Sequence, residues 1–280
     1  MSGALIGVAL AAATSLAAAA LPRQPAADDG SVVVTLEPYA GRLVTVSAML
    51  RSEKLTLLVD TGGGQTLITP RAAARIGCTP GGRSIGFRMT GERVVFELCD
   101  ISVLEIGGHS FARTEVAVWD VTAVLPKDLP PLDGVLALDT LAGQPFTLRL
   151  AARTLTLESA RSLKRQVRRM TRVQARTATG IAGADLTVYI RGALDKAGWF
   201  LFDSGNLDLI CVGPHMVQRS VTVPSVLASA ALSVDGLPTR NVPVSVREII
   251  YDGVLAEDFL RQWIWTFRLS SGELWVAPAR

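Results

Sequence analysis

Histidine and cysteine are scarce in this 280-residue chain, which has two histidines and three cysteines. So few histidines leave little material for a Ser–His or Cys–His nucleophile system, because each needs a histidine beside its nucleophile. The sequence has no His-Glu-x-x-His zinc motif, no P-loop and no dinucleotide-binding glycine fingerprint. We therefore expect neither a metal nor a cofactor, and we expect His109 and His215 to be structural or exposed.

A strong excess of charge is also lacking. Lys plus Arg is 28 and Asp plus Glu is 25, which gives a net charge of +3. That balance is too mild to predict nucleic-acid binding. Hydrophobic residues make up 49% of the chain, enough for a sizeable core. Beyond the N-terminal segment, no stretch has the roughly 18 apolar residues that a membrane span needs.

The first 20 residues form an uncharged run of small apolar residues that ends in an alanine cluster, and a short spacer that contains Arg23 follows to residue 27. This composition predicts a secretory signal with a cleavage site near Ala20 or Ala27. Because no Lys or Arg precedes the apolar run, an uncleaved membrane anchor stays open as the alternative. We expect an exported protein, periplasmic or secreted, with or without such an anchor.

The cysteines are too few for a disulfide scaffold. Cys78 and Cys99 lie in the same half of the chain and are able to form one bridge in an oxidising compartment, although spacing alone leaves this open. Cys211 lies in an apolar run and is expected to be a buried, unreactive thiol.

An internal repeat organises the chain. Residues 133–157 and 252–276 align without a gap and agree at 11 of 25 positions, starting from a shared Asp-Gly-Val-Leu-Ala. Short alternating runs separated by glycine turns fill both copies, which predicts a mostly β protein built by duplication. The repeat divides the chain into a first lobe over 31–158 and a second lobe over 179–280.

Two further features are the segment that connects the halves and a difference in length between them. The segment 159–178 between them is basic and has no acidic residue, which favours a solvated linker, with a basic amphipathic helix that contacts a membrane surface as the alternative. The first half also has 24 more residues from Asp60 to Asp133 than the second half has from Asp203 to Asp252. We expect these to form a hairpin within 78–100, with its turn near Met89–Gly91, and we expect a short helix over 70–78.

Each half delivers an aspartate from the end of an apolar run into a glycine turn: "LLVDTGG" around Asp60 and "LFDSGN" around Asp203. Two carboxyls that face each other cannot ionise independently, so such a pair holds one shared proton. One oxygen is then a base toward water, and the protonated partner donates to a carbonyl. Turn-capping aspartates are the structural alternative.

These elements resemble the active-site motifs of the aspartic proteases, both pepsin-like and retropepsin-like. The matching residues are Leu58-Val59-Asp60-Thr61-Gly62 and Leu201-Phe202-Asp203-Ser204-Gly205, each followed in order by an Asp-Gly-Val-Leu element. The resemblance implies a bilobal acid-protease-like fold with Asp60 and Asp203 as the catalytic pair. It implies supporting roles for Thr61, Gly62, Ser204 and Gly205, and a flap formed by the extra hairpin.

Function follows from the resemblance as an expectation. We expect an aspartic endopeptidase that acts on peptides or proteins as a monomer, since each lobe supplies one aspartate. The alternatives are an inactive peptide-binding module of the same fold, and pairing of two chains through their first lobes.

The departures from the motif are Gly63 and Asn206, which follow the two turns, and Ala137 and Ala256, where glycine is typical of the family. We expect the Asn206 amide to donate to the nearby carboxylate. The flap aromatic has no clear match, and Phe87 is the candidate.

Overall fold

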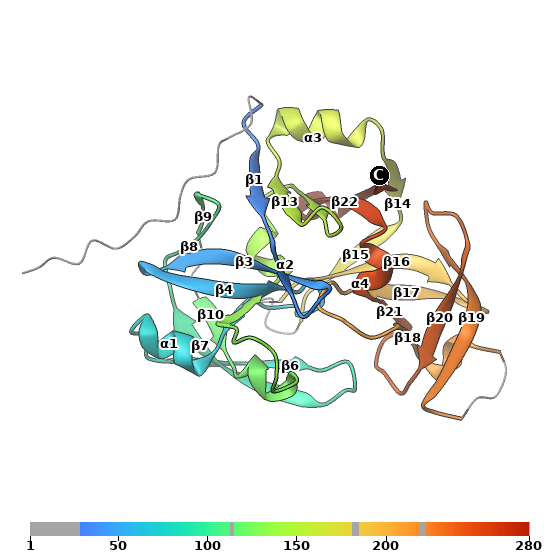
Figure 1. The fold of residues 1–280 in the computed structure, drawn as a ribbon, viewed down its shortest axis with the longest axis horizontal. Coiled ribbons are helices and arrows are strands. Elements are labelled where there is room, and N and C mark those ends of the chain that lie inside the picture. Colours follow the sequence, from blue (N-terminus) through green and yellow to red (C-terminus); the bar gives the residue numbers. More distant parts are fainter. Residues whose placement is uncertain (1–28, 113–114, 181–184, 219–221, 280) are drawn as a thin grey trace, which may run out of the picture.

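The computed structural model describes residues 29–112, 115–180, 185–218 and 222–279. These residues form three β-sheets with four short α-helices (Figure 1). Two of the sheets belong to one lobe each, and the third is made by strands of both lobes. The mostly β, bilobal prediction is confirmed.

The first-lobe sheet has ten strands in the order β6-β7-β10-β5-β11-β4-β3-β8-β9, with β2 paired to β3. Its members are β2 (Glu37–Tyr39), β3 (Leu43–Leu50), β4 (Glu53–Val59), β5 (Leu67–Ile68), β6 (Gly82–Phe87), β7 (Arg93–Asp100), β8 (Val103–Ile106), β9 (His109–Ala112), β10 (Glu115–Val118) and β11 (Gly134–Leu136). At its centre β4 and β11 run parallel, which buries both, and their sequences are accordingly rich in Leu and Val.

The second-lobe sheet has seven strands in the order β15-β16-β17-β21-β18-β20-β19. Its members are β15 (Ala175–Ala178), β16 (Thr187–Ala193), β17 (Ala197–Phe202), β18 (Ile210–Val212), β19 (Ser225–Val234), β20 (Arg240–Val246) and β21 (Gly253–Leu255). Here β19 also pairs with β16, so the sheet curls back on itself. The parallel pair β17–β21 corresponds to β4–β11 of the first lobe.

The third sheet joins the lobes in the order β1-β13-β12-β22-β23-β14. Its members are β1 (Val32–Thr35), β12 (Phe146–Arg149), β13 (Thr154–Leu157), β14 (Thr171–Val173), β22 (Trp263–Arg268) and β23 (Glu273–Pro278). Thr147 and Thr266 occupy the same position of the sequence repeat, and they face each other across β12 and β22 with their hydroxyls 2.8 Å apart. A local two-fold axis therefore passes between them.

The helices are short. They are α1 (Pro70–Arg75), α2 (Leu138–Leu141), α3 (Ala160–Val167) and α4 (Glu257–Leu260), with 3-10 turns at η1 (Val121–Val124), η2 (Pro214–Met216) and η3 (Leu269–Ser271). The predicted helix at 70–78 is α1, which begins at Pro70 because the Thr69 hydroxyl accepts a hydrogen bond from Ala72 N–H at 3.2 Å. No helix within the described ranges is long and apolar enough to cross a membrane.

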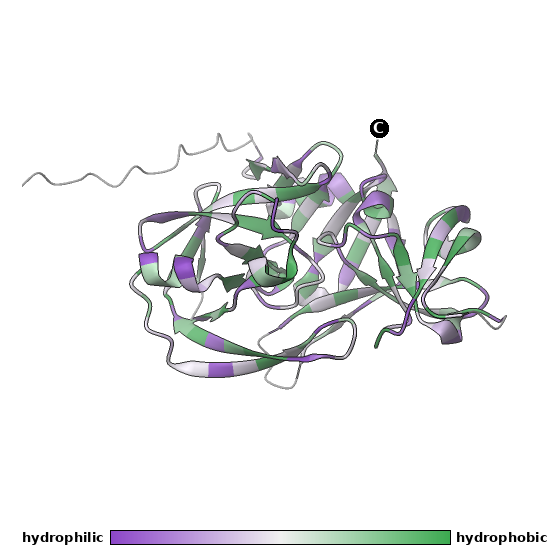
Figure 2. Cartoon of the chain, turned by 60° about the horizontal axis from the view of Figure 1, so that its bottom comes forward, coloured by the Kyte–Doolittle hydropathy of each residue, from purple (hydrophilic) through white to green (hydrophobic). Residues whose placement is uncertain are grey.

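One large core connects the lobes. Its aromatic part lies where β12 and β22 meet the end of β17: Phe146 stacks on Phe267 with ring centroids 4.6 Å apart, and Phe202 contacts Trp265 edge-on at 5.0 Å. Apolar residues fill the strands at the centre of the molecule (Figure 2). Phe202 directly precedes Asp203, so the second-lobe aspartate is anchored on the sheet shared by both lobes.

The extra residues of the first half form the expected hairpin, β6–β7. Its turn is closed by hydrogen bonds from Arg88 N–H to Glu92 O and from Gly91 N–H to Arg88 O, where Gly91 has a φ of +84°. We call this hairpin the flap. The outer strand β6 has no second-lobe counterpart: β7 pairs with β6, whereas β19, at the same place in the second-lobe sheet, pairs with β16 instead of an extra strand.

The basic segment 159–178 is largely regular rather than a plain linker. It forms α3, then β14 of the shared sheet and β15 of the second-lobe sheet. The second-lobe sheet therefore begins at Ala175, four residues before the expected start of that lobe. The amphipathic helix, which was the alternative to a linker, is present as α3 but is shorter than the pattern suggested, because Thr171 already pairs with Val276 in the sheet.

Candidate active site

Asp60 comes directly after β4 and is placed by a parallel strand. Val59 lies opposite Leu136 of β11, and Asp60 N–H continues the pairing by donating to Leu136 O at 3.0 Å. The chain then leaves the sheet through the turn Thr61–Gly64. A buried strand thus fixes the backbone position from which the Asp60 side chain extends.

Asp203 is placed in the same way by the second lobe. Phe202 lies opposite Leu255 of β21, and Asp203 N–H donates to Leu255 O at 3.2 Å. In both lobes the aspartate directly follows the last paired residue of its strand, and its N–H donates to the last residue of the parallel strand. The two aspartates therefore hold equivalent positions, one from each half of the chain.

Thr61 and Ser204 tie the two turns together across the lobe boundary. Ser204 N–H donates to Thr61 Oγ1 at 2.9 Å, and Thr61 N–H donates to Ser204 Oγ at 3.1 Å. Each hydroxyl also donates to the opposite strand: Thr61 to Phe202 O at 2.9 Å and Ser204 to Val59 O at 2.8 Å. Both residues are buried, so these four bonds hold the turns at a fixed separation.

Gly62 and Gly205 let the turns approach each other's carboxyls. Gly62 N–H donates to Asp60 Oδ1 at 2.9 Å, and Gly205 N–H donates to Asp203 Oδ1 at 3.0 Å. A Cβ on Gly62 would lie 2.4 Å from Asp203 Cγ, and one on Gly205 would lie 2.4 Å from Asp60 Cγ. No other residue type fits at either position, since real Cβ atoms do not approach a carboxyl that closely.

The two carboxyls interact directly. Burial raises the pKa of Asp60 above its ordinary value, and the hydrogen bond from Asp203 and the N–H groups of Gly62 and Gly63 oppose that rise. Burial raises the pKa of Asp203 well above its ordinary value, and the negative charge and hydrogen bond of Asp60 raise it further. The pair, here called the dyad, thus favours the state with one shared proton.

The structure places three of the sequence departures and explains one of them, Gly63. A Cβ on Gly63 would lie 3.3 Å from Asp60 Oδ2, so glycine relieves a tight contact there. The backbone N–H of Asn206 bonds to Asp203. The expected contact of its side chain was wrong: Oδ1 accepts from Asp208 N–H at 2.9 Å, and the buried Nδ2 has no hydrogen-bond partner in the described structure. Ala137 is fully buried, and its N–H donates to Thr66 Oγ1.

Sequence reasoning missed the support behind these turns. Asp139 accepts hydrogen bonds from both the N–H and the hydroxyl of Thr66, at 3.0 and 2.6 Å, and so braces the end of the first turn. Arg42 crosses to the second lobe, where it pairs with Asp258 and donates to Leu207 O at 2.6 Å. The one signal for these contacts in the sequence was the Leu-Ala-x-Asp pattern that ends both copies of the Asp-Gly-Val-Leu element and places Asp139 and Asp258 at the same position of the repeat.

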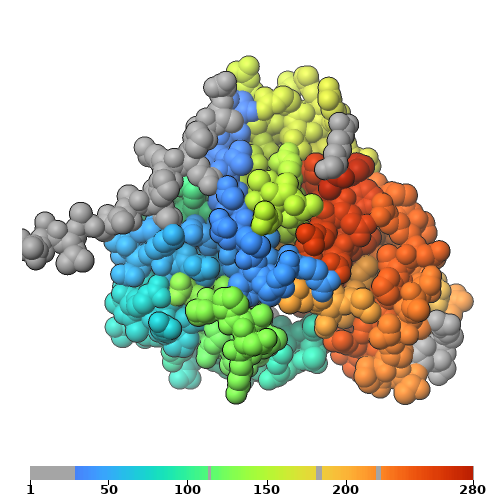
Figure 3. Space-filling view, viewed as in Figure 1, coloured from blue at the N-terminus to red at the C-terminus, as the bar shows by residue number. Residues whose placement is uncertain are grey.

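The flap reaches the other lobe. Met89 O at its tip accepts a hydrogen bond of 2.9 Å from Ile250 N–H, in the segment that leads into β21. Phe87 and Ile85 on the flap are more than half exposed, so Phe87 is available to a ligand but is not packed in this structure. Figure 3 shows a notch between the first-lobe and second-lobe surfaces at the lower edge of the molecule.

The second-lobe wall beside the dyad contains two tyrosines that the sequence did not single out. Tyr189 and Tyr251 lie with ring centroids 5.9 Å apart and pack against a small apolar cluster that includes Leu201, two residues before Asp203. Burial raises the pKa of Tyr251 strongly, and the charges of Tyr189 and Asp203 add to that rise. Tyr251 therefore stays neutral and is a hydrogen-bond donor at this wall.

The remaining titratable candidates lie elsewhere. His215 is exposed and bonds to Asp252 at 3.0 Å, and the ring of His109 packs on Phe111. Cys211 is buried, and burial raises the pKa of its thiol. Within the described ranges, no group of three His, Cys, Asp or Glu side chains is placed to hold a metal ion.

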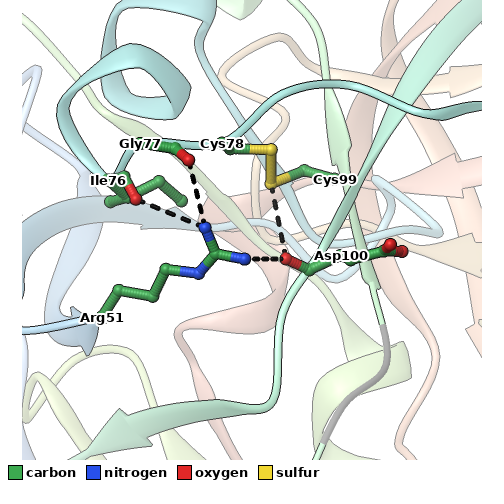
Figure 4. Close-up of a disulfide and its surroundings, with 6 residues drawn as sticks. All are labelled: Arg51, Ile76, Gly77, Cys78, Cys99 and Asp100. Carbon is green, nitrogen blue, oxygen red and sulfur yellow. Dashed lines mark hydrogen bonds between the residues drawn. A yellow bond between two sulfur atoms is a disulfide. The ribbon is translucent and has the colours of Figure 1, made fainter.

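Cys78 and Cys99 form a disulfide at the base of the flap (Figure 4). Cys78 follows α1 and Cys99 lies on β7, so the bond fastens the flap to the body of the first lobe. The Arg51 guanidinium reinforces this attachment by donating to Gly77 O at 3.3 Å and to Asp100 O at 2.5 Å.

Comparisons with known proteins agree with this geometry. A sequence profile described as "Aspartyl protease" matches residues 46–140, about a third of the chain, which include Asp60 and β11. No curated protein sequence matches the chain.

Among solved structures, the chain resembles the soybean basic 7S globulin with a TM-score of 0.57 and 10% identity, over 89% of this chain and 95% of that one. It resembles conglutin gamma, a basic 7S globulin from lupine seeds, with a TM-score of 0.56 at the same identity and coverage. Such low identity shows a common fold and no more. The chain therefore has an aspartyl-protease-like fold, in which each lobe contributes one aspartate to a shared centre.

Proposed function

We propose that the chain is an aspartic endopeptidase whose catalytic residues are Asp60 and Asp203. The observation that carries this proposal is the pairing of two carboxyls with raised pKa values in a braced, symmetric setting. Turn-capping aspartates would need neither a partner carboxyl nor two glycines shaped around it, so the geometry favours chemistry over a purely structural role.

The proposed reaction uses the shared proton. The ionised carboxylate takes a proton from a water held between the two side chains, and the water oxygen bonds to the substrate carbonyl carbon. The protonated carboxyl gives its proton to the carbonyl oxygen, which forms a neutral gem-diol. When the diol collapses, the C–N bond breaks, the nitrogen takes the proton of the dyad, and one diol hydroxyl returns a proton to the dyad. The dyad therefore ends with the one proton it began with, and no metal or cofactor takes part.

A single chain suffices in this proposal. The turns of Asp60 and Asp203 are equivalent in register, bracing and glycine contacts, so the second lobe has its own counterpart of the Asp60 turn. A continuous chain with one flap is the pepsin-like arrangement, and we favour it over pairing of two chains through their first lobes. A peptide or protein substrate would bind between the lobes, beneath the flap.

Export is part of the same proposal. The apolar segment at residues 1–27 and the Cys78–Cys99 disulfide both suit an oxidising compartment outside the cytoplasm. Mass spectrometry of the mature N-terminus in the native host distinguishes a cleaved signal from a retained anchor. Residence in the cytoplasm with reduced Cys78 and Cys99 would contradict export.

The second candidate is a peptide-binding module without catalysis. The fold similarity to two proteins named as globulins rather than proteases favours it. In that case the cleft would retain peptides intact.

The deciding experiment is incubation of the full chain with a diverse peptide pool from about pH 3 to about pH 7.5, with Asp60→Asn and Asp203→Asn alongside. We expect cleavage by the wild type and none by either variant. Loss with Asp60→Asn alone would point to pairing of chains. Intact peptides that co-purify with folded, inactive wild type would favour the binding module.

A further inference from the structure

The helix α3 presents positive charge on one side. Arg161, Lys164, Arg165 and Arg168 follow one another at the spacing i, i+3, i+4, i+7, which places them on one face of the helix, and Arg169 comes next. All five side chains are exposed. We call these five residues the basic stripe. The apolar side of α3 is already used, because Leu163 is buried against the body of the protein.

Nearby acidic groups leave most of this charge uncompensated. Arg165 pairs with Asp29, while Glu158 is buried and accepts hydrogen bonds from Thr147, at 2.6 Å, and from Ser162. In the part of the chain that the structure describes, the other four members of the basic stripe have no ion pair. Such a cluster is costly to maintain by self-repulsion, and an anionic partner relieves that cost.

A hollow lined by several arginines lies next to the basic stripe. It has a volume of about 650 Å³, and its lining includes Arg149, Arg165, Arg168 and Arg169. Arg149 is held at its wall by hydrogen bonds to Thr156 and Gln166. A phosphate-sized anion fits a hollow of this volume, and arginine forks match phosphate geometry.

The stripe lies on the face of the molecule opposite the dyad. Side chains of β22 alternate between its two faces: Trp265 and Phe267 pack against Phe202, next to Asp203, whereas Thr266 between them donates to Met170 Sδ on the other face. Figure 1 shows α3 at the top of the molecule and the flap strand β6 at the bottom. A flat partner bound to the basic stripe therefore does not cover the dyad side of the molecule.

The N-terminal segment joins the body at the same place. Asp29, the first described residue, pairs with Arg165 and accepts a hydrogen bond from Ser159 at the start of α3, at 2.7 Å. Residues 1–22, which precede it in the sequence, have no charged side chain and are mostly apolar. The described structure thus begins beside the basic stripe, at Asp29, shortly after the most apolar stretch of the sequence.

We propose that the basic stripe is a docking surface for an anionic lipid bilayer, with headgroup phosphates entering the hollow lined by Arg149. Clusters of exposed Lys and Arg beside an apolar segment are the composition that anionic leaflets attract. Docking through this face turns the dyad side and the flap away from the membrane. The proposal does not depend on peptide cleavage.

The test is sedimentation of the full chain with vesicles of phosphatidylcholine alone and with vesicles that also contain phosphatidylglycerol. Binding to the neutral vesicles measures the apolar segment, and the gain on the anionic vesicles measures the stripe. We expect the variant with Arg161→Gln, Lys164→Gln, Arg168→Gln and Arg169→Gln to lose at least about tenfold of that gain. Raising the salt concentration should abolish the same gain in the wild type.

A matched variant removes four exposed cations elsewhere: Lys54→Gln, Arg71→Gln, Lys127→Gln and Lys196→Gln. It has the same net charge as the stripe variant and should keep the gain within about twofold. Equal loss in both variants, or equal binding of the wild type to both vesicle types, overturns the proposal. Binding to double-stranded DNA that depends on the stripe, without any gain on anionic vesicles, overturns it in favour of a nucleic-acid partner.

Discussion

The carbonyl of Met89 accepts a hydrogen bond from the backbone N–H of Ile250 at 2.9 Å, and this bond joins the flap tip of the first lobe to the second lobe. A Cβ on Gly91, in the same turn, would lie 3.1 Å from Ile250 Cγ2, so the tip fits closely against its neighbour. The flap is thus in a closed position, and under the proposed function this contact must open before a long peptide can enter between the lobes.

A reversible lock tests the role of that contact. Backbone atoms in hydrogen-bond contact bring the Cα atoms of residues 89 and 250 into disulfide range, so Met89→Cys with Ile250→Cys should form a bond on oxidation. We expect oxidation to reduce peptide cleavage at least about tenfold and reduction to restore it. Each single-cysteine variant is the control, and unchanged cleavage by the locked form would show that substrate enters without flap opening.

The close approach of Gly62 to Asp203 makes this glycine irreplaceable. In Gly62→Ala the new methyl group would collide with the Asp203 carboxyl and displace it, because the Cβ site lies 2.4 Å from Cγ. Misplacement of a reacting group by about 1 Å costs about 100-fold in rate, so kcat should fall by that order. Gly143→Ala, at a site with open space around it, should leave kcat unchanged.

The hydroxyl of Thr61 should be worth more to stability than its size suggests. In Thr61→Ala the buried Phe202 carbonyl and Ser204 N–H both lose their partner, which should lower the free energy of unfolding by about 2–3 kcal/mol. Denaturant titration measures this change. Thr61→Ser retains the hydroxyl and should recover most of the loss; if it is as unstable as Thr61→Ala, the methyl group rather than the bonds matters.

The dyad should make stability depend on pH in a definite direction. The pKa of Asp203 is raised well above its ordinary value of 3.8 in the folded state, first by burial and then by Asp60. Its contribution to stability is therefore fully present below about pH 3.8 and is lost as the pH rises through the folded pKa. Asp203→Asn should be more stable than the wild type at neutral pH, and the difference in Tm should vanish in acid. A difference that is constant with pH would contradict this assignment.

The disulfide at the base of the flap should stabilise the first lobe. Cys78 and Cys99 are 21 residues apart, and a loop of that length gives about 3 kcal/mol by restricting the unfolded chain. Cys78→Ser with Cys99→Ser should therefore lower the free energy of unfolding by about that amount. Reductant should destabilise the wild type equally and leave the double variant unaffected, even though Cys211 is still present.

The sequence was sufficient for much of the fold because its signals were local or repeated. Asp60 and Asp203 each end an apolar run and precede a glycine, and the repeat at 133–157 and 252–276 fixes their common strand register. The flap followed from a difference in length between the halves. In each case the information lies within about ten residues or within a comparison of the chain with itself.

The missed features depend on contacts between distant residues. Nothing local marks Arg42 as the partner of Asp258, which lies in the other lobe. Asp139 and Thr66 belong to the same lobe, but they are 73 residues apart in the sequence, so their contact forms only when that lobe folds. The Asn206 side-chain oxygen accepts a hydrogen bond from the N–H of Asp208, a local turn contact that asparagine commonly makes and that the motif alone did not reveal. Tyr189 and Tyr251 carried no motif at all.

The pairing of β12 with β22 around Thr147 and Thr266 affects both the cooperativity of unfolding and the aggregation of fragments. Because the central strands of the shared sheet come from different halves, neither half alone has its full complement of backbone partners. A fragment ending before α3 would expose β12 as a bare edge, ready to pair with another copy. The two halves should therefore melt in one transition, and a substitution in either should lower the melting temperature of both.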